Sequence, residues 1–196
     1  MNVTKHEWSD IVEIVHPIKS KKKINAMKRQ LNDRDRLMFV IGINSALRIS
    51  DILRLKVSDV RNKDGSLSEY IFVREEKTKK SKMFLVNGAN KRELTAYLTP
   101  DMSDNAYLFP SRKGVNKPIT RFQALRILKQ AAKRVGIKEN VGTHTLRKTF
   151  AYHRFKSGVE LTYITKALNH SSQRETMRYI GIEQSDMDEI YAGIEL

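Results

Sequence analysis

Apolar residues recur at helical spacing through most of this 196-residue chain, so the chain is predicted to be mainly helical. Residues 68–74 and 82–86 instead alternate apolar and polar positions, as β-strands do, and a lysine-rich segment joins them into a hairpin. In the helix predicted at residues 120–135, Phe122 is predicted to face the core. The helices are predicted at residues 4–16, 24–46, 91–98, 120–135, 143–155 and 161–168, with a break in the second at Asn32-Asp33.

The pattern divides the chain into three parts. Residues 1–23 are predicted to form a short N-terminal helix and a basic linker, and residues 24–180 form one domain. Residues 181–196 are acidic in an otherwise basic chain and suit a small amphipathic helix. This tail helix either packs on its own domain or is exchanged with a neighbouring subunit.

The net charge of the chain limits the kinds of partner that it is expected to bind. The chain has 37 basic and 22 acidic residues, a formal net charge of +15, which favours a polyanion such as nucleic acid. An anionic membrane surface and a merely basic protein without such a partner are the alternatives. The absence of cysteine excludes disulfides and zinc–thiolate sites and predicts a reducing compartment, the cytoplasm. No apolar run approaches the roughly 20 residues of a membrane span, so no membrane partner is expected.

Four residues between Thr143 and Tyr179 combine the chemistry needed to attack a phosphodiester. Arg147 can grip phosphate oxygens through paired hydrogen bonds, and His144 lies three residues before it, on the same helix face. Histidines, including His170, move protons near neutral pH. The Tyr179 hydroxyl can form a covalent ester.

Two earlier stretches carry further candidate cations. Arg48 lies among small and apolar residues, where a charge needs a partner, and Asp51 follows one helical turn later. A plain surface arginine explains this stretch equally well. Lys77, Lys79 and Lys80 lie in the predicted hairpin turn and could reach a DNA groove, although a solvated turn is the commoner meaning of such a run.

Taken together, these residues resemble the catalytic set of the tyrosine recombinases, or phage integrases. The resemblance runs from about residue 25 to the C-terminus and is closest to small single-domain members such as the fimbrial phase-variation invertases. It implies an α+β fold, mostly helical, with a small antiparallel three-stranded sheet. The motifs that carry it are Ala46-Leu47-Arg48-Ile49-Ser50-Asp51, His144-Thr145-Leu146-Arg147, Leu168-Asn169-His170-Ser171-Ser172 and Thr176-Met177-Arg178-Tyr179.

The resemblance implies a role for each residue of the set. Tyr179 is the nucleophile that forms a 3′-phosphotyrosyl link. Arg48 and Arg147 hold the phosphate and stabilise the transition state. Lys77 protonates the leaving 5′-oxygen, and Lys79 and Lys80 are alternative candidates for this role. The supporting roles fall to His144, which assists proton transfer at the tyrosine, to His170, which binds the phosphate, and to Asp51, which braces Arg48.

The resemblance also implies the partners. The chain would act on double-stranded DNA as a homo-tetramer, in a bacterial or phage-infected cell, and a need for accessory DNA-bending proteins stays open. It would need neither ATP, nor a metal ion, nor any other cofactor. The side chains expected to contact DNA are Lys79, Lys80, Arg112, Lys113, Arg121 and Lys148.

Three departures from the family pattern stand out. Only 47 residues precede Arg48, so the N-terminal domain that closes a clamp around DNA in larger members is expected to be missing or reduced. Lys148 stands where many members have a second histidine, and Asn169 stands where glycine is usual.

Two other functions share much of this pattern. A DNA-binding transcriptional regulator could keep the fold without its chemistry, but it would have no need of Tyr179 and both histidines. A type IB topoisomerase resembles the same active site, but the small size of the chain and its tail disfavour that function.

Overall fold

Helix α2 (Asp33–Ser45) is the centre of the fold, because it packs on both α4 (Gly88–Tyr97) and α6 (Thr143–Lys156). Its apolar side chains are buried all round the helix, as expected of a helix enclosed by others. The backbones of α2 and α6 approach closely at Gly42, where a Cβ atom would lie 2.5 Å from Leu146 Cδ1. Only glycine fits there without displacing a neighbour.

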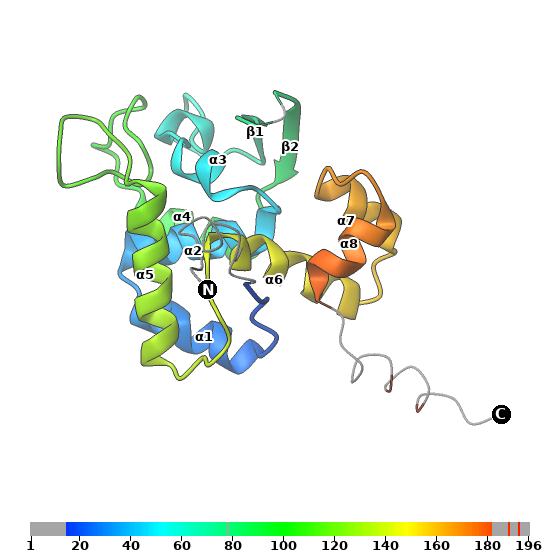
Figure 1. The fold of residues 1–196 in the computed structure, drawn as a ribbon. Coiled ribbons are helices and arrows are strands. Elements are labelled where there is room, and N and C mark those ends of the chain that lie inside the picture. The colour runs from blue at the N-terminus through cyan, green and yellow to red at the C-terminus, as the bar shows by residue number, and fades with distance from the viewer. Residues whose placement is uncertain (1–14, 78, 182–187, 189–191, 193–196) are drawn as a thin grey trace, which may run out of the picture.

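The computed structural model describes residues 15–77, 79–181, 188 and 192 (Figure 1). The elements besides those above are α1 (Lys21–Gln30), α3 (Ile49–Leu53), the 3₁₀ turn η1 (Val57–Asp59), β1 (Tyr70–Arg74), β2 (Ser81–Leu85), α5 (Arg121–Arg134), α7 (Leu161–Ala167) and α8 (Gln173–Ile180). In the described residues the chain is therefore mostly helical, as predicted, and none of the described helices is long and apolar enough to cross a membrane.

Side-chain caps explain where several helices begin. The predicted break at Asn32-Asp33 is confirmed, because Asn32 accepts a hydrogen bond from the backbone N–H of Asp35 and so starts α2. Thr120 and Gln123 form a reciprocal capping box at the start of α5. The lysine run predicted as a linker enters α1 at Lys21, one residue after its cap.

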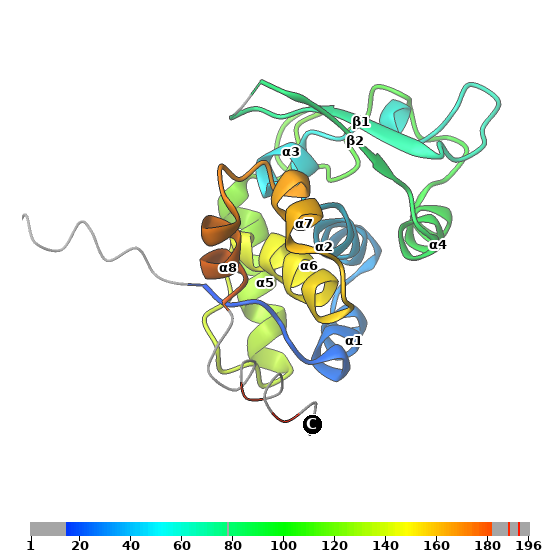
Figure 2. The same cartoon turned by 90° about the vertical axis from the view of Figure 1, so that its right-hand side faces the viewer.

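The sheet has two strands in the described residues, so the prediction of three was wrong. Strands β1 and β2 pair antiparallel from Tyr70 opposite Leu85 to Arg74 opposite Ser81. The segment before β1 forms a tight turn at Gly65, and it pairs only through an isolated β-bridge between Arg61 and Leu67. Figure 2 shows the hairpin lying across the top of the helices, with its tip on the same side of the view as α8.

The described side chains form two hydrophobic cores. The larger lies among α1 to α5 and the first half of α6. The smaller joins the second half of α6 to α7 and α8, which stand apart from the other helices in Figure 1. Ala46, at the end of α2, belongs to this smaller core, which therefore meets the larger one at the point where α2 stops.

Three further predictions concern Phe122 and the two ends of the chain. Phe122 was wrongly predicted to face the core: it is 81% exposed, because it lies on the same face of α5 as the exposed Arg126 and Lys129, opposite the face that Ala124 and Leu128 bury. The N-terminal helix predicted at residues 4–16 and the tail helix fall almost entirely outside the described residues.

Candidate functional site

Four of the six predicted catalytic residues, Arg48, Lys77, His144 and Arg147, line one small cavity. The cavity has a volume of about 230 Å³. Its walls come from the start of α3, the hairpin loop, the first turn of α5 and the first turns of α6. The charged and titratable side chains that line it are Arg48, Lys77, Arg121, His144 and Arg147.

Arg147 is held in place by the ends of two helices. It is only 3% exposed. Its Nη1 donates to the carbonyl oxygen of Ala46 at 2.7 Å, and its Nη2 donates to that of Leu168. These residues are the C-caps of α2 and α7, where carbonyls without helical partners favour a cation. The ends of α2 and α7 therefore orient this guanidinium.

Arg48 pairs with a carboxylate that sequence reasoning missed. It precedes α3 as the N-cap residue, and its Nη1 lies 3.1 Å from Oε1 of the buried Glu75. Asp51, predicted as its brace, instead accepts a hydrogen bond from the backbone N–H of Glu76 at 2.9 Å. The role of Asp51 toward Arg48 stays a prediction, and the structure gives the direct contact to Glu75.

Tyr179 reaches the site of its own chain from the last turn of α8. Its hydroxyl lies 3.5 Å from Nδ1 of His144. Its ring stands edge-on to the His170 ring, with centroids 4.9 Å apart, and Lys148 Nζ lies 5.1 Å from its centroid. Burial raises the pKa of Tyr179 to about 12, against the opposing charges of Arg147 and then Arg48. The phenol is therefore protonated at neutral pH and needs a base to become a nucleophile.

His144 is suited to be that base. Burial, followed by the charges of Arg121 and Arg147, lowers its pKa below the ordinary value for histidine. A neutral imidazole at pH 7 with its proton on Nε2 leaves Nδ1 free to accept the phenolic proton.

His170 is fixed by its neighbours on α8. Its Nδ1 lies 3.1 Å from Thr176 Oγ1, and its Nε2 lies 4.0 Å from a Glu175 carboxylate oxygen. Burial lowers its pKa, and Glu175 opposes that change. The preceding residue, Asn169, has a left-handed backbone with φ 50°, which explains why glycine is usual at this position.

The hairpin contributes one expected and one unexpected lysine. Lys77 lines the cavity, whereas Lys79 and Lys80 are exposed in the same loop. Lys82, which sequence reasoning missed, is largely buried and donates to the carbonyl oxygens of Ala167 at 2.6 Å and Ala46 at 3.3 Å. Burial, and then the charge of Arg147, lowers its pKa to about 8.

The other residues predicted to bind DNA are spread around the cavity. Arg121 lines it, and Lys148 lies on the Tyr179 side of it. Arg112 and Lys113 are exposed in the loop before α5. No group of three His, Asp or Glu side chains in the described residues comes close enough together to hold a metal ion.

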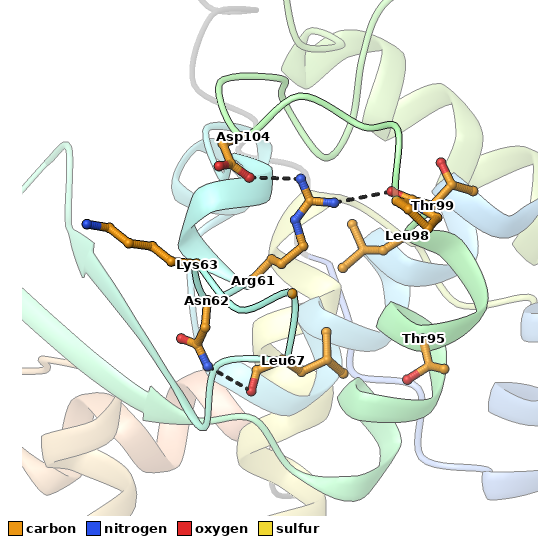
Figure 3. A pocket seen from close by; sticks show the side chains of 10 residues that line it. Arg61, Asn62, Lys63, Leu67, Thr95, Leu98, Thr99 and Asp104 are labelled. Carbon is orange, nitrogen blue, oxygen red and sulfur yellow. Dashed lines mark hydrogen bonds and ion pairs between the residues drawn. The ribbon is translucent and has the colours of Figure 1, made fainter.

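A larger cavity, of about 540 Å³, lies elsewhere and contains none of the predicted residues. Figure 3 shows Arg61 at its centre. The guanidinium of Arg61 is engaged by the carbonyl oxygen of Thr99 at 3.2 Å and by Asp104 at 2.8 Å. Its donors therefore hold two loops together.

Comparison with known proteins gives a consistent result. The family described as "Phage integrase family" matches residues 7–185. The "Probable integrase/recombinase YoeC" of Bacillus subtilis (strain 168) is 48% identical over 176 residues, which cover 88% of this chain and 93% of that protein. Against other curated tyrosine recombinases, such as XerA of Pyrococcus furiosus, the chain spans about half of their length.

Solved structures have the same fold. The crystal structure of XerA recombinase superposes with a TM-score of 0.72 at 23% identity, covering 91% of this chain and 65% of that one. The XerH site-specific recombinase bound to its palindromic difH substrate, a post-cleavage complex, superposes with a TM-score of 0.69 at 20% identity, covering 90% and 52%.

Proposed function

This chain belongs to the phage integrase family, the site-specific tyrosine recombinases, and we propose that it breaks and rejoins duplex DNA through a phosphotyrosyl bond to Tyr179. One observation carries the proposal: Tyr179 lies beside His144 in the same chain, next to a cavity that both Arg48 and Arg147 line. A protein that only binds DNA has no use for a phenol beside a base at a phosphate-sized cation site.

The cations bind the scissile phosphate. The N–H groups of Arg48 and Arg147 that face the cavity donate to its non-bridging oxygens. During attack the phosphorus becomes pentacoordinate and its oxygens gain charge, which donors already in place stabilise better than water does. The carbonyls of Ala46 and Leu168 hold Arg147 in the required orientation before DNA arrives.

The protons balance across the step. His144 takes the phenolic proton while the Tyr179 oxygen forms its bond to phosphorus. The bond from phosphorus to the 5′-oxygen breaks, and Lys77 gives that oxygen a proton, which leaves a free 5′-hydroxyl. His170 donates to the phosphate. Rejoining is the same step in reverse with the 5′-hydroxyl of the partner strand, so one ester replaces another and no ATP is consumed.

DNA is the partner, as in the XerH complex, and the net charge of +15 favours it. We propose that the contacts outside the cavity include Lys79, Lys80, Arg112 and Lys113, and that four copies assemble on two DNA sites. Exchange of the acidic tail, residues 181–196, between neighbouring subunits would hold this assembly together. Accessory DNA-bending proteins belong to the same proposal.

Covalent capture tests the proposed chemistry. Nicked duplexes made from inverted repeats in the DNA that flanks the gene trap a 3′-phosphotyrosyl adduct, because the short cleaved strand diffuses away. The wild-type protein is expected to form an adduct that survives denaturing electrophoresis, and Tyr179→Phe is expected to bind the same duplex without forming one. Equal capture by both proteins would refute the role of Tyr179.

A further inference from the structure

Glu75 is a fully buried carboxylate at a position where the surrounding sequence is rich in lysine. Its side chain is 0% exposed. An ionised carboxylate without water is stable only when cations and hydrogen-bond donors replace the lost hydration. The groups around Glu75 therefore show what it holds together.

The side chain of Glu75 contacts three separate segments. Oε1 lies 3.1 Å from Arg48 Nη1, at the start of α3, and 3.9 Å from Arg147 Nη1, on α6. Oε2 accepts a hydrogen bond of 2.8 Å from the side-chain amide of Asn169, in the loop before His170. One carboxylate thus touches both phosphate-binding arginines and the loop of a histidine.

The backbone of Glu75 closes the loop that carries Lys77. Its N–H donates to the carbonyl oxygen of Lys80 at 3.0 Å, and its carbonyl oxygen accepts from the N–H of Lys79 at 2.9 Å. The next residue, Glu76, donates its N–H to Asp51. Any shift of the Glu75 side chain therefore moves the base of this loop, on which Lys77 reaches the cavity.

Asn169 has two functions at its position. Its φ of 50° is one that glycine adopts freely and asparagine tolerates. Glycine would supply this backbone but no donor, whereas asparagine supplies both. The substitution of Asn169 for the usual glycine therefore adds a link between the hairpin and the loop of His170.

Resting on the proposed function, we propose that Glu75, held by Asn169, is a positioning residue that fixes residues 75–77 against the two arginines and so places Lys77 at the leaving 5′-oxygen. The two-stranded hairpin has no third strand beside it in the described residues, so this link stands in for sheet support. Loss of the link between Glu75 and Asn169 is therefore expected to slow protonation of the leaving group.

A change of leaving atom isolates that step. In a nicked duplex with sulfur in place of the bridging 5′-oxygen, the leaving group departs as a thiolate, because a thiol with a pKa of about 8.5 needs no proton donor. Cleavage of the oxygen duplex needs Lys77, whereas cleavage of the sulfur duplex does not. Single-turnover rates are measured on both duplexes at saturating protein.

Asn169→Gly is the decisive variant, because glycine accepts the backbone angle and only the amide is lost. Glu75→Gln is the second variant, and it removes the charge. Each is expected to cleave the oxygen duplex about 10- to 100-fold more slowly, a loss typical of a misplaced catalytic group, and the sulfur duplex nearly as fast as wild type. Glu76→Gln makes the same chemical change next to Glu75 on a side chain that is 53% exposed, and it should cleave both duplexes like wild type.

The outcomes separate the inference from the proposed function. An equal loss on both duplexes, or no loss on the oxygen duplex, would overturn the positioning role of Glu75. Failure of the wild-type protein to form the Tyr179 adduct on either duplex would overturn the proposed function instead. If Glu75→Gln fails to fold, Asn169→Gly alone decides the matter.

Discussion

Arg147 and Lys82 donate to the same oxygen atom, the carbonyl of Ala46, at 2.7 and 3.3 Å. Ala46 ends α2 with a left-handed φ of 56°, which turns its carbonyl away from the helix. Lys82 comes from β2 and Arg147 from α6, so one buried helix end connects the hairpin to the two arginines of the site. Two cations can share this acceptor because the helix end carries partial negative charge.

Lys82→Met is expected to remove a pH dependence from stability. The pKa of Lys82 is lowered to about 8 in the folded protein, so between about pH 8 and 10.5 the unfolded chain binds more protons. The unfolding free energy of wild type should therefore rise relative to the variant across this window, by on the order of 3 kcal/mol. Urea unfolding of both proteins at a series of pH values measures the difference, and a constant difference would contradict a buried, titrating Lys82.

The pH–rate profile of cleavage should have a rising limb on its acid side, and this limb should report the titration of His144. Burial lowers its pKa below the ordinary value for histidine, and only the neutral form accepts the phenolic proton, so the rate should rise with pH through that pKa and then level off. Tyr179 stays protonated up to about pH 12 and adds no limb near neutrality. His144→Gln should be about 100-fold slower and lack the limb, whereas His170→Gln should keep it. Single-turnover rates from pH 5 to 8 test this, and a limb retained in His144→Gln would assign it elsewhere.

Arg147→Lys is expected to be far from conservative. A lysine has one charged head and cannot reach the carbonyls of Ala46 and Leu168 while also facing the cavity. Covalent capture should fall about 100-fold or more, with DNA binding largely kept. Arg54→Lys, at a side chain that is 61% exposed, is the matched control and should behave as wild type in adduct formation and gel shift.

The hairpin lysines should separate by function. Lys77→Ala is expected to lose cleavage of the oxygen duplex by about 100-fold and to recover on the sulfur duplex, if Lys77 is the proton donor as we propose. Lys79→Ala should weaken DNA binding and its salt dependence, with little change in the rate once DNA is bound. If the sulfur duplex restored cleavage by Lys79→Ala but not by Lys77→Ala, Lys79 would be the proton donor and Lys77 the DNA contact.

Gly42→Ala should destabilise the fold by about 1–3 kcal/mol, because the added Cβ meets Leu146 at 2.5 Å in a packed core. Gly88→Ala, whose Cβ would meet only Arg92 Nη1 at 3.7 Å, should be neutral or slightly stabilising. Thermal and urea unfolding compare the two. Similar effects in both would mean that α2 and α6 do not touch at Gly42.

Much of the site could be predicted from sequence because each of its motifs is local. Arg48, His144, Arg147 and Tyr179 lie in short segments whose order and composition resemble a known family, and the structure brings them together. Glu75 was missed because its sequence context is that of a solvated lysine-rich turn, and Lys82 was missed because it was predicted only as the first residue of a strand. Their burial depends on where α7 and the end of α2 pack, and hydrophobic periodicity does not encode that.

The errors have similar causes. Phe122 was assigned to the core because it is apolar, although its spacing places it on the face of α5 that carries Arg126 and Lys129. The third strand was expected from the resemblance alone, and the residues available for it form a turn at Gly65 instead.

The two cores have a practical consequence for anyone altering this protein. Tyr179 packs against the smaller core and Arg48 lies on the larger, so the distance between them depends on packing in the smaller core. A methyl group removed from Ile164, which is buried in the smaller core, would let α7 and α8 settle differently and carry Tyr179 with them. Activity can thus be tuned, or lost, by substitutions that an inspection of the catalytic side chains alone would pass as harmless.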